Sequence, residues 1–298
     1  MKKFFYIAIA FMALSSCSNT IEEATITPDV FPDGVMKESI VLNGISRDYL
    51  LYVPKAYNGR DPLPIVFNFH GENDNADDFL WQTSDMRTIA NVTDNEFFIV
   101  YPQARICDGK VTWNSSSEAG TKCNDDLSFI NALIDSIASK VEINTDKIFA
   151  GGYSEGGTFA LSLGMSNKRF AAVGSVAGTM SVFDTTTQAT PVIFIHGTAD
   201  STFPYFGDVN TESIQSQLDF WIKTNNADST PLTSSETSPY GVTIDRYQYL
   251  NGNKVSVEHH KVNDGLHMWN IEQIVYPAGN PDDETGLLLW KFFECHSL

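Results

Sequence analysis

The chain has 298 residues, of which 42% are hydrophobic and 20 are phenylalanine, so it can bury a large core. A length of this order suits one large α/β domain better than two small domains. The 37 acidic and 19 basic side chains leave a formal net charge of −18, which excludes nucleic acid as an expected partner.

The first residues have the pattern of an export signal. Two lysines precede an apolar run, residues 4–14, that is too short to be a permanent membrane span. Small residues then lead to Cys17, and this resembles the lipobox of bacterial lipoproteins. The resemblance implies a signal peptide over residues 1–16, lipidation of Cys17, and export to a bacterial membrane, with the outer membrane or cell surface favoured. An ordinary secretory signal that contains a cysteine is the alternative.

A polar tether is expected over residues 17–36, because this stretch has no apolar period. The rest of the chain, residues 37–298, is expected to form a single α/β domain. It starts with two alternating segments, 38–43 and 48–53, joined by an Asn-Gly dipeptide, which is typical of an antiparallel hairpin.

Apolar runs and helical spacing then alternate along the chain. The later strands are predicted at 64–69, 97–101, 147–151, 170–175, 191–196, 243–249 and 254–262. The helices are predicted at 76–90, 126–141, 155–166, 211–224 and 283–296. We interpret Asp125 and Asp126 as an N-cap, and the Ser/Thr-rich segment 224–239 as a long surface loop. This order predicts a doubly wound, mostly parallel sheet of about eight strands, with helices on both faces.

Residues 152–156 read Gly-Tyr-Ser-Glu-Gly, a G-x-S-x-G pattern between a predicted strand and a predicted helix. A serine hydroxyl is a weak nucleophile unless a sharp turn exposes it beside a base. Two glycines remove the Cβ atoms that would block so tight a turn. The pattern in this context predicts that Ser154 is a nucleophile.

An acid and a base follow later strands. Ligands of open α/β sheets bind beyond the carboxyl ends of the strands. Asp200 follows segment 191–196, and His267 follows the last strand. The chain order Ser, Asp, His is that of α/β-hydrolases, in which Asp200 would orient the imidazole and His267 would take the proton of Ser154. Asp264 is a rival acid, although its position favours a turn-stabilising role.

Backbone N–H groups should stabilise the oxyanion of an acyl-transfer reaction. One donor is expected from Glu155, directly after the nucleophile, and the other from Glu72, in the loop after segment 64–69. Gly71 would let that loop approach closely. Four other histidines are interpreted as structural: His70, His196, His259 and His260. His296 lies at the extreme C-terminus and is not a favoured base.

Cys107 and Cys123 flank a loop rich in Gly, Ser and Asn. Because an exported protein meets an oxidising space, we predict a disulfide between them and an unpaired Cys295. Pairing of Cys295 with either of the other two is the alternative. No spacing of Cys or His suggests a metal site.

These motifs resemble those of the polyhydroxybutyrate depolymerase-like esterases, which include feruloyl and acetyl-xylan esterases and lipoprotein members. The resemblance runs from about residue 38 to residue 296, and its most specific part is His-Gly-Thr-Ala-Asp at 196–200 with Phe-Pro-Tyr-Phe-Gly at 203–207. The last family motif, Gly-His-x-Trp-Pro-Gly, reads Leu-His-Met-Trp-Asn at 266–270. The flanking differences put the substrate-side shape of this loop in doubt.

The resemblance implies an α/β-hydrolase fold and a secreted serine esterase that works through an acyl-enzyme without a cofactor. Plant-polysaccharide esters, feruloyl or acetyl and hence carbohydrate-linked, are the expected substrates. A polyhydroxybutyrate or other short polyester is the alternative, and a peptidase or a non-catalytic glycan-binding lipoprotein ranks below both. Aromatic residues on the expected active face could contact the substrate or pack the rim of the sheet: Trp113, Tyr153, Phe203, Tyr205 and Trp269.

Overall fold

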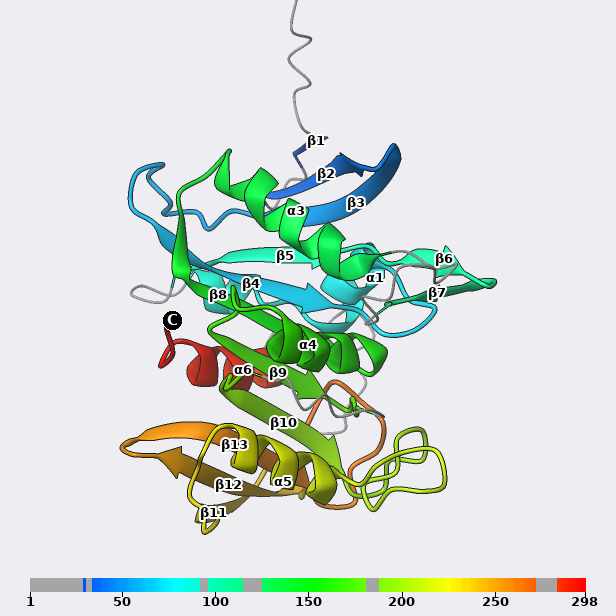
Figure 1. The fold of residues 1–298 in the computed structure, drawn as a ribbon, viewed down its shortest axis with the longest axis vertical. Helices are drawn as coiled ribbons and strands as arrows, with labels where there is room; N and C mark the ends of the chain where they lie inside the picture. Colours follow the sequence, from blue (N-terminus) through cyan, green and yellow to red (C-terminus); the bar gives the residue numbers. More distant parts are fainter. Residues whose placement is uncertain (1–28, 31–33, 92–95, 115–124, 181–187, 272–282) are drawn as a thin grey trace, which may run out of the picture.

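The computed structural model describes residues 29–30, 34–91, 96–114, 125–180, 188–271 and 283–298. In these ranges one sheet of eleven strands has the order β1-β2-β3-β5-β4-β8-β9-β10-β13-β12-β11, and β6 and β7 form a separate hairpin (Figure 1). The strands are β1 (Asp29–Val30), β2 (Val35–Leu42), β3 (Ile45–Tyr52), β4 (Leu63–Phe69), β5 (Phe98–Pro102), β6 (Arg105–Cys107), β7 (Lys110–Thr112), β8 (Ile143–Tyr153), β9 (Ala172–Val176), β10 (Val192–Gly197), β11 (Leu232–Thr237), β12 (Thr243–Asn251) and β13 (Lys254–Val262).

Helices cover both faces of the sheet. The helical segments are α1 (Ala76–Asp78), the π-helical turn η1 (Phe79–Thr83), α2 (Arg87–Ala90), α3 (Asp126–Ala138), α4 (Glu155–Ser166), α5 (Ile214–Thr224) and α6 (Glu284–Phe293). One core cluster joins α3, α4 and α5 to the sheet, and the other joins α1, η1, α2 and α6 to the opposite face (Figure 1). The predicted α/β class with helices on both faces is therefore confirmed.

The six central strands β5, β4, β8, β9, β10 and β13 are parallel to one another. Their side chains enter both cores: Ile65 of β4 belongs to the first cluster and Val66 to the second. A strand buried on both faces needs apolar residues at every position, which is why these strands read as solid apolar runs. Antiparallel strands extend the sheet on both sides.

The predicted leading hairpin is present as β2 and β3. Leu42 pairs with Ile45, so the turn consists of Asn43 and Gly44. Both have positive φ, 52° and 79°, as a type I′ turn requires. The sheet begins earlier in the chain than predicted. Its strand β1 and the start of β2 lie in the segment predicted as a tether.

The sheet is larger than the predicted eight or so strands. The segment predicted as a long surface loop, 224–239, contains the edge strand β11, whose six residues are all exposed. It pairs with β12 alone. A strand with no buried face carries no apolar alternation, so the sequence pattern did not indicate it.

The helix predicted at 76–90 is broken into α1, η1 and α2. Ser84 leaves the helical conformation with φ −133° and ψ 87°. Its carbonyl oxygen accepts a hydrogen bond from Tyr101 Oη at 2.8 Å, and its hydroxyl donates to Asp283 at 2.9 Å. Tertiary contacts therefore interrupt a segment whose local pattern is helical.

The two acidic residues at the start of α3 have different roles. Asp125 is the N-cap and accepts from Ser128 N at 2.9 Å, as predicted. Asp126 is fully buried, and its carboxylate pairs with Arg47 at 2.5 Å and accepts from Asn114 N at 2.7 Å. The N-cap prediction was wrong for Asp126, because the side chain satisfies a buried guanidinium instead.

None of the helices in the described part of the chain combines the length and the apolar character needed to cross a bilayer. The predicted signal peptide and Cys17 lie outside the described residues.

Candidate active site

Ser154 lies at the turn between β8 and α4, with φ 55° and ψ −122°. A non-glycine residue rarely adopts this conformation, and its presence marks stored backbone strain. A Cβ on Gly152 would lie 2.4 Å from the backbone of Gly156, and one on Gly156 would lie 2.2 Å from Phe69 O. The two glycines are therefore required because strand and helix backbones approach so closely.

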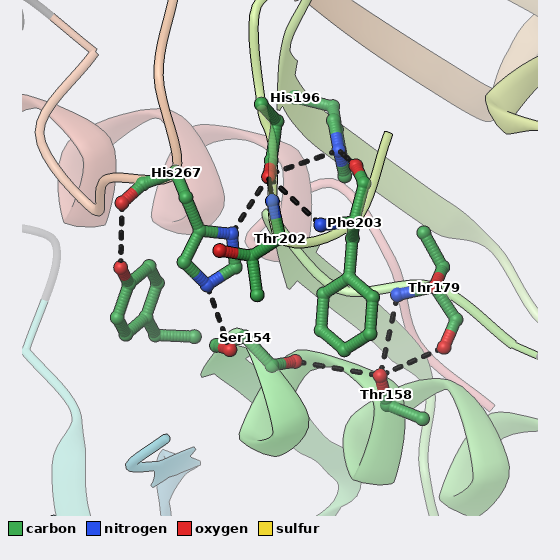
Figure 2. A network of polar contacts seen from close by, with 9 residues as sticks. Ser154, Thr158, Thr179, His196, Thr202, Phe203 and His267 are labelled. Atoms are coloured by element: carbon green, nitrogen blue, oxygen red, sulfur yellow. Dashed lines mark hydrogen bonds and ion pairs between the residues drawn. The ribbon is translucent and has the colours of Figure 1, made fainter. Parts of the chain in front are cut away.

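Ser154, Asp200 and His267 come together at the carboxyl ends of β8, β10 and β13. Figure 2 shows the His267 ring pointing toward Ser154. His267 Nε2 lies 2.8 Å from Ser154 Oγ, and His267 Nδ1 lies 2.8 Å from Asp200 Oδ2. Because the carboxylate can only accept, Nδ1 carries the ring hydrogen, and Nε2 can accept the serine proton. The three residues thus form one continuous hydrogen-bonded chain.

The Asp200 carboxylate has further donors. Its Oδ1 accepts from the N–H groups of Thr202 and Phe203, each at 2.8 Å. Its Oδ2 also lies 3.2 Å from His196 Nε2. Burial alone would raise the pKa of Asp200, but the hydrogen bonds from His196, His267 and Phe203 N outweigh burial and lower it well below the ordinary value. The carboxylate therefore stays charged beside the imidazole.

His196 is the site residue that sequence reasoning missed, since it was interpreted as structural. Its Nε2 donates to Phe203 O at 2.8 Å as well as facing Asp200, so it holds the loop that carries the acid. The only signal in the sequence was its position four residues before Asp200 at a strand end. The rival acid Asp264 lies in a turn with φ 55°, where its N–H donates to Thr198 Oγ1.

One predicted oxyanion donor, Glu155, directly follows Ser154, and the loop that carries the other, Glu72, lies close to it. Glu155 is the first residue of α4, so its N–H has no acceptor within the helix. A Cβ on Gly71 would lie 3.5 Å from Ser154 Cβ, which places the loop after β4 against the nucleophile. The Glu72 side chain pairs with Lys110 at 2.7 Å, and Asn73 N donates to Val111 O at 2.8 Å. The β6–β7 hairpin thus holds this loop in place.

His70 anchors the same loop and is not placed for proton transfer. Its Nε2 accepts from Ala104 N at 3.1 Å, so its Nδ1 carries the hydrogen and donates to Gly71 O at 2.8 Å. Burial lowers the pKa of His70 to about 4, which keeps the ring neutral. The structural interpretation of this histidine agrees with these contacts.

Two of the five candidate substrate aromatics are packed inside the protein. Trp113 is 6% exposed, stacks on Phe159, and donates from Nε1 to His70 O at 2.8 Å. Trp269 is 3% exposed and donates from Nε1 to Asp283 Oδ1 at 2.8 Å. Of the two roles left open for these residues, packing within the protein is the one that their burial and their hydrogen bonds support.

The other three aromatics are partly exposed. Tyr205 Oη lies 2.9 Å from His259 Nε2, and Tyr153 Oη donates to His267 O at 2.9 Å, so both also hold loops of the site. The Phe203 ring lies beside the His267 ring, with 5.7 Å between centroids (Figure 2). The Tyr153 ring also lies beside the His267 ring, with 5.3 Å between centroids. Phe203 and Tyr153 are therefore the two candidate aromatics whose rings neighbour the imidazole.

Cys107 is disulfide-bonded, and Cys295 is free and exposed. These two facts exclude a Cys107–Cys295 bond, while the predicted partner Cys123 lies outside the described residues. In the same described ranges, no group of three or more His, Cys, Asp or Glu side chains could hold a metal ion.

The parallel core, the strained serine between β8 and α4, and the Ser–His–Asp chain define an α/β-hydrolase fold. Solved structures with the same fold include an acetyl xylan esterase from Aspergillus awamori, with a TM-score of 0.60, 14% identity, and coverage of 86% of this chain and 99% of that chain. A mutant of the feruloyl esterase module from Clostridium thermocellum, complexed with sinapinate, has a TM-score of 0.59 and 12% identity, and covers 89% of this chain and 91% of that one.

The chain belongs to the Esterase PHB depolymerase family, whose model matches residues 47–235. It is 26% identical over 184 residues to "Probable feruloyl esterase C" of Aspergillus flavus, covering 59% of this chain and 64% of that protein. It is 27% identical over 165 residues to a bifunctional acetylxylan esterase/xylanase of Neocallimastix patriciarum, covering 54% and 22%. The chain thus spans less than two thirds of the length of these curated relatives. The family match includes Ser154 and Asp200, while His267 lies beyond it.

Proposed function

We propose that the protein is a serine carboxylic-ester hydrolase, with Ser154 as nucleophile, His267 as general base and acid, and Asp200 as the residue that orients the imidazole. The observation that carries this proposal is the chain of two 2.8 Å contacts from Ser154 Oγ through His267 to Asp200. Membership of the esterase family supports the same reaction.

The residues divide the reaction into two half-reactions. His267 Nε2 takes the Ser154 proton while Oγ attacks the ester carbonyl carbon and forms a tetrahedral intermediate. The intermediate collapses when His267 gives that proton to the leaving alcohol. Water then attacks the acyl-enzyme in the same way and releases the acid and the free serine.

Charge develops at two places during each half-reaction. The N–H groups of Glu155 and Glu72 would donate to the oxyanion, and the positive end of α4 adds to their effect. The imidazolium of His267 forms against the Asp200 carboxylate, whose lowered pKa keeps it ionised. The fixed donors on Asp200 hold the acid in position for this step.

For the substrate we propose feruloyl or acetyl esters of plant polysaccharides. The relatives named as feruloyl and acetylxylan esterases support this class. Phe203 beside His267 offers a ring against which an acyl group could pack. The family name supports a hydroxybutyrate polyester as the second candidate.

A comparison of the wild-type protein with Ser154→Ala on p-nitrophenyl acetate and butyrate tests the reaction. Loss of a triad serine costs on the order of 10⁶-fold in kcat. Ser162→Ala is the matched control, since Ser162 lies on the same helix and donates to Thr158 O at 3.1 Å away from the triad. Equal rates for wild type and Ser154→Ala would overturn the proposal. Methyl ferulate, acetylated xylan and hydroxybutyrate oligomers would then separate the substrate classes.

We also propose that the mature protein is exported and held at a bacterial membrane by lipid on Cys17. Lipid chains on one residue anchor a protein firmly when two or more are present. Cys17→Ala should move the protein from the membrane fraction to the soluble fraction. An unchanged membrane fraction would contradict lipidation at this residue.

A further inference from the structure

A buried carboxylate outside the triad contacts the loop that carries the proposed base. Asp283 precedes α6 and is 2% exposed. Its Oδ1 accepts from Gly286 N and from Trp269 Nε1, each at 2.8 Å. Trp269 lies two residues after His267. The side chain of Asp283 therefore ties α6 to the histidine loop, residues 266–270.

The second carboxylate oxygen of Asp283 is linked by hydrogen bonds to β4, the strand that precedes the oxyanion loop. Asp283 Oδ2 accepts from Ser84 Oγ at 2.9 Å, and Ser84 Oγ accepts from Asn68 Nδ2 at 2.8 Å. Ser84 and Asn68 are fully buried. Asn68 belongs to β4 and lies three residues before Gly71, the glycine packed against Ser154. We call Asn68, Ser84, Trp269 and Asp283 the Asp283 network.

The backbone of the histidine loop is held at the same place. Thr285 Oγ1 donates to Trp269 O at 2.7 Å and lies 3.3 Å from Ile271 N, which donates to it. The Trp269 ring packs edge-to-face on Phe79, with 5.5 Å between centroids. The N-cap and first turn of α6 thus hold both the indole and the main chain of Trp269 in place.

Helix capping alone does not explain this arrangement. An N-cap needs one bond to an N–H of the first turn, and Gly286 N supplies it. A buried carboxylate is costly unless it is well bonded. Burial raises the pKa of Asp283 to about 6, although bonds from Gly286 N, Trp269 and Ser84 act to lower it, and nearby Asp85 raises it further. Of the two bonds beyond the cap, one leads to the histidine loop and the other leads, through Ser84, to Asn68 on β4.

We propose that Asp283 is a positioning residue, which through Trp269 fixes the loop that presents His267 and through Ser84 and Asn68 ties that loop to the strand below the oxyanion loop. This inference rests on the proposed esterase function. Tyr153 restrains the same loop by donating to His267 O at 2.9 Å. The Asp283 network restrains this loop at Trp269, two residues after His267.

Loss of this restraint should act on the chemical step. The imidazole must meet Ser154 Oγ within hydrogen-bond distance, and a misplacement of about 1 Å can cost ~10²-fold in rate. Asp283 and Trp269 are buried, so they do not contact the substrate. Their loss should therefore lower kcat and leave KM within about twofold.

The test uses Asp283→Ala, Trp269→Phe, the double variant and Asp283→Asn on p-nitrophenyl butyrate. Each of the first two should lower kcat by ~10- to 100-fold. The double variant should be no slower than the slower single variant, because both remove one shared bond. Asp283→Asn should stay within about threefold of wild type, since its Oδ1 can accept from Trp269 and Gly286 and its amide can donate to Ser84.

Asn225→Ala is the control for a loss of stability. Asn225 is also buried, and its Nδ2 donates to Thr190 O at 2.8 Å and Ser256 O at 3.2 Å, near the amino ends of β10 and β13. It should lower Tm without lowering kcat. Equal losses of kcat in Asn225→Ala and Asp283→Ala, or additive losses in the double variant, would overturn the inference. Trp269→Phe keeps a ring against Phe79 and carries the test if Asp283→Ala does not fold.

The outcomes separate this inference from the function on which it rests. If Ser154→Ala keeps wild-type activity, the proposed function fails. If Ser154→Ala is inactive while Asp283→Ala and Trp269→Phe keep their kcat, the esterase proposal stands and the positioning role fails.

Discussion

Ser154 is half-buried, and its backbone conformation suits glycine better than serine. Its φ of 55° and ψ of −122° persist because Ser154 N donates to Val176 O at 2.8 Å and Ser154 O accepts from Thr158 N at 3.0 Å. Such a conformation costs about 1–3 kcal/mol. These hydrogen bonds therefore hold Ser154 in a backbone conformation that serine by itself disfavours.

This strain predicts that Ser154→Gly is inactive yet more stable than Ser154→Ala. Glycine adopts positive φ without steric cost, while alanine keeps the strained Cβ. Glycine also gains freedom in the unfolded chain, so the net difference in unfolding free energy should be about 1 kcal/mol. Urea denaturation of both variants measures it. Equal or lower stability of the glycine variant would contradict strain at this residue.

Asp283 predicts a pH-dependent stability difference. Its pKa rises from the ordinary 3.8 to about 6 in the folded protein. The folded state thus binds the extra proton between these values, and unfolding free energy contributed by Asp283 falls as pH rises through this window. Asp283→Asn lacks this titration, so its stability relative to wild type should increase by roughly 2 kcal/mol from pH 4 to pH 7. Parallel stability curves for the two proteins in urea would contradict this.

At the scale of elements, α4 is pressed against the end of β4. A Cβ on Gly156 would lie 2.2 Å from Phe69 O and 2.5 Å from His70 O, which are backbone atoms of the neighbouring strand and loop. The helix that follows the nucleophile can therefore lie this close to β4 only because residue 156 is glycine. The same approach brings the oxyanion loop beside Ser154.

Gly156→Ala should push α4 from β4, with a loss of at least about 1–3 kcal/mol of stability and of most esterase activity. Gly164→Ala on the same helix is the control, since its Cβ would meet the Val173 side chain at 2.7 Å rather than backbone. That variant should lose less stability and keep its activity. Thermal unfolding and p-nitrophenyl acetate hydrolysis measure both effects. A tolerated Gly156→Ala would argue against the close approach.

The strands that are buried on both faces were predicted well, because such burial makes their local sequence apolar throughout. All nine predicted strands are present, eight with shifted ends and β13 with the predicted bounds. The break at Ser84 was not predictable, since its cause is bonds to Tyr101 and Asp283, 17 and 199 residues away. The exposed strand β11 was missed because pairing with β12, rather than an apolar pattern, makes it a strand.

At the scale of the whole molecule, the charge is far from balanced. A net charge of −18 makes the folded chain repel itself. Salt shortens the range of this repulsion from ~30 Å at 0.01 M to ~8 Å at 0.15 M. We therefore predict that unfolding free energy rises with NaCl over this range at pH 7. A flat or falling dependence would show that exposed ion pairs, such as Lys37–Asp77, outweigh the net charge.

The triad also belongs to this scale, because its members lie 113 and 67 residues apart in sequence. Parallel strands bring their carboxyl ends to one edge of the sheet, so residues that follow strands meet there. This is why the positions of Ser154, Asp200 and His267 could be predicted before their distances were known. Their roles in catalysis stay predictions until the serine variant is assayed.

The sequence by itself determined the apolar strands, the Asn-Gly hairpin turn and the glycines of the elbow. Each depends on local steric rules or on whether a face is buried. The tertiary structure alone decided that Trp113 and Trp269 point inward, that His196 supports Asp200, and that Asp283 grips the histidine loop. These depend on which side of a loop a side chain faces and which polar groups it meets there, and no local pattern encodes that choice.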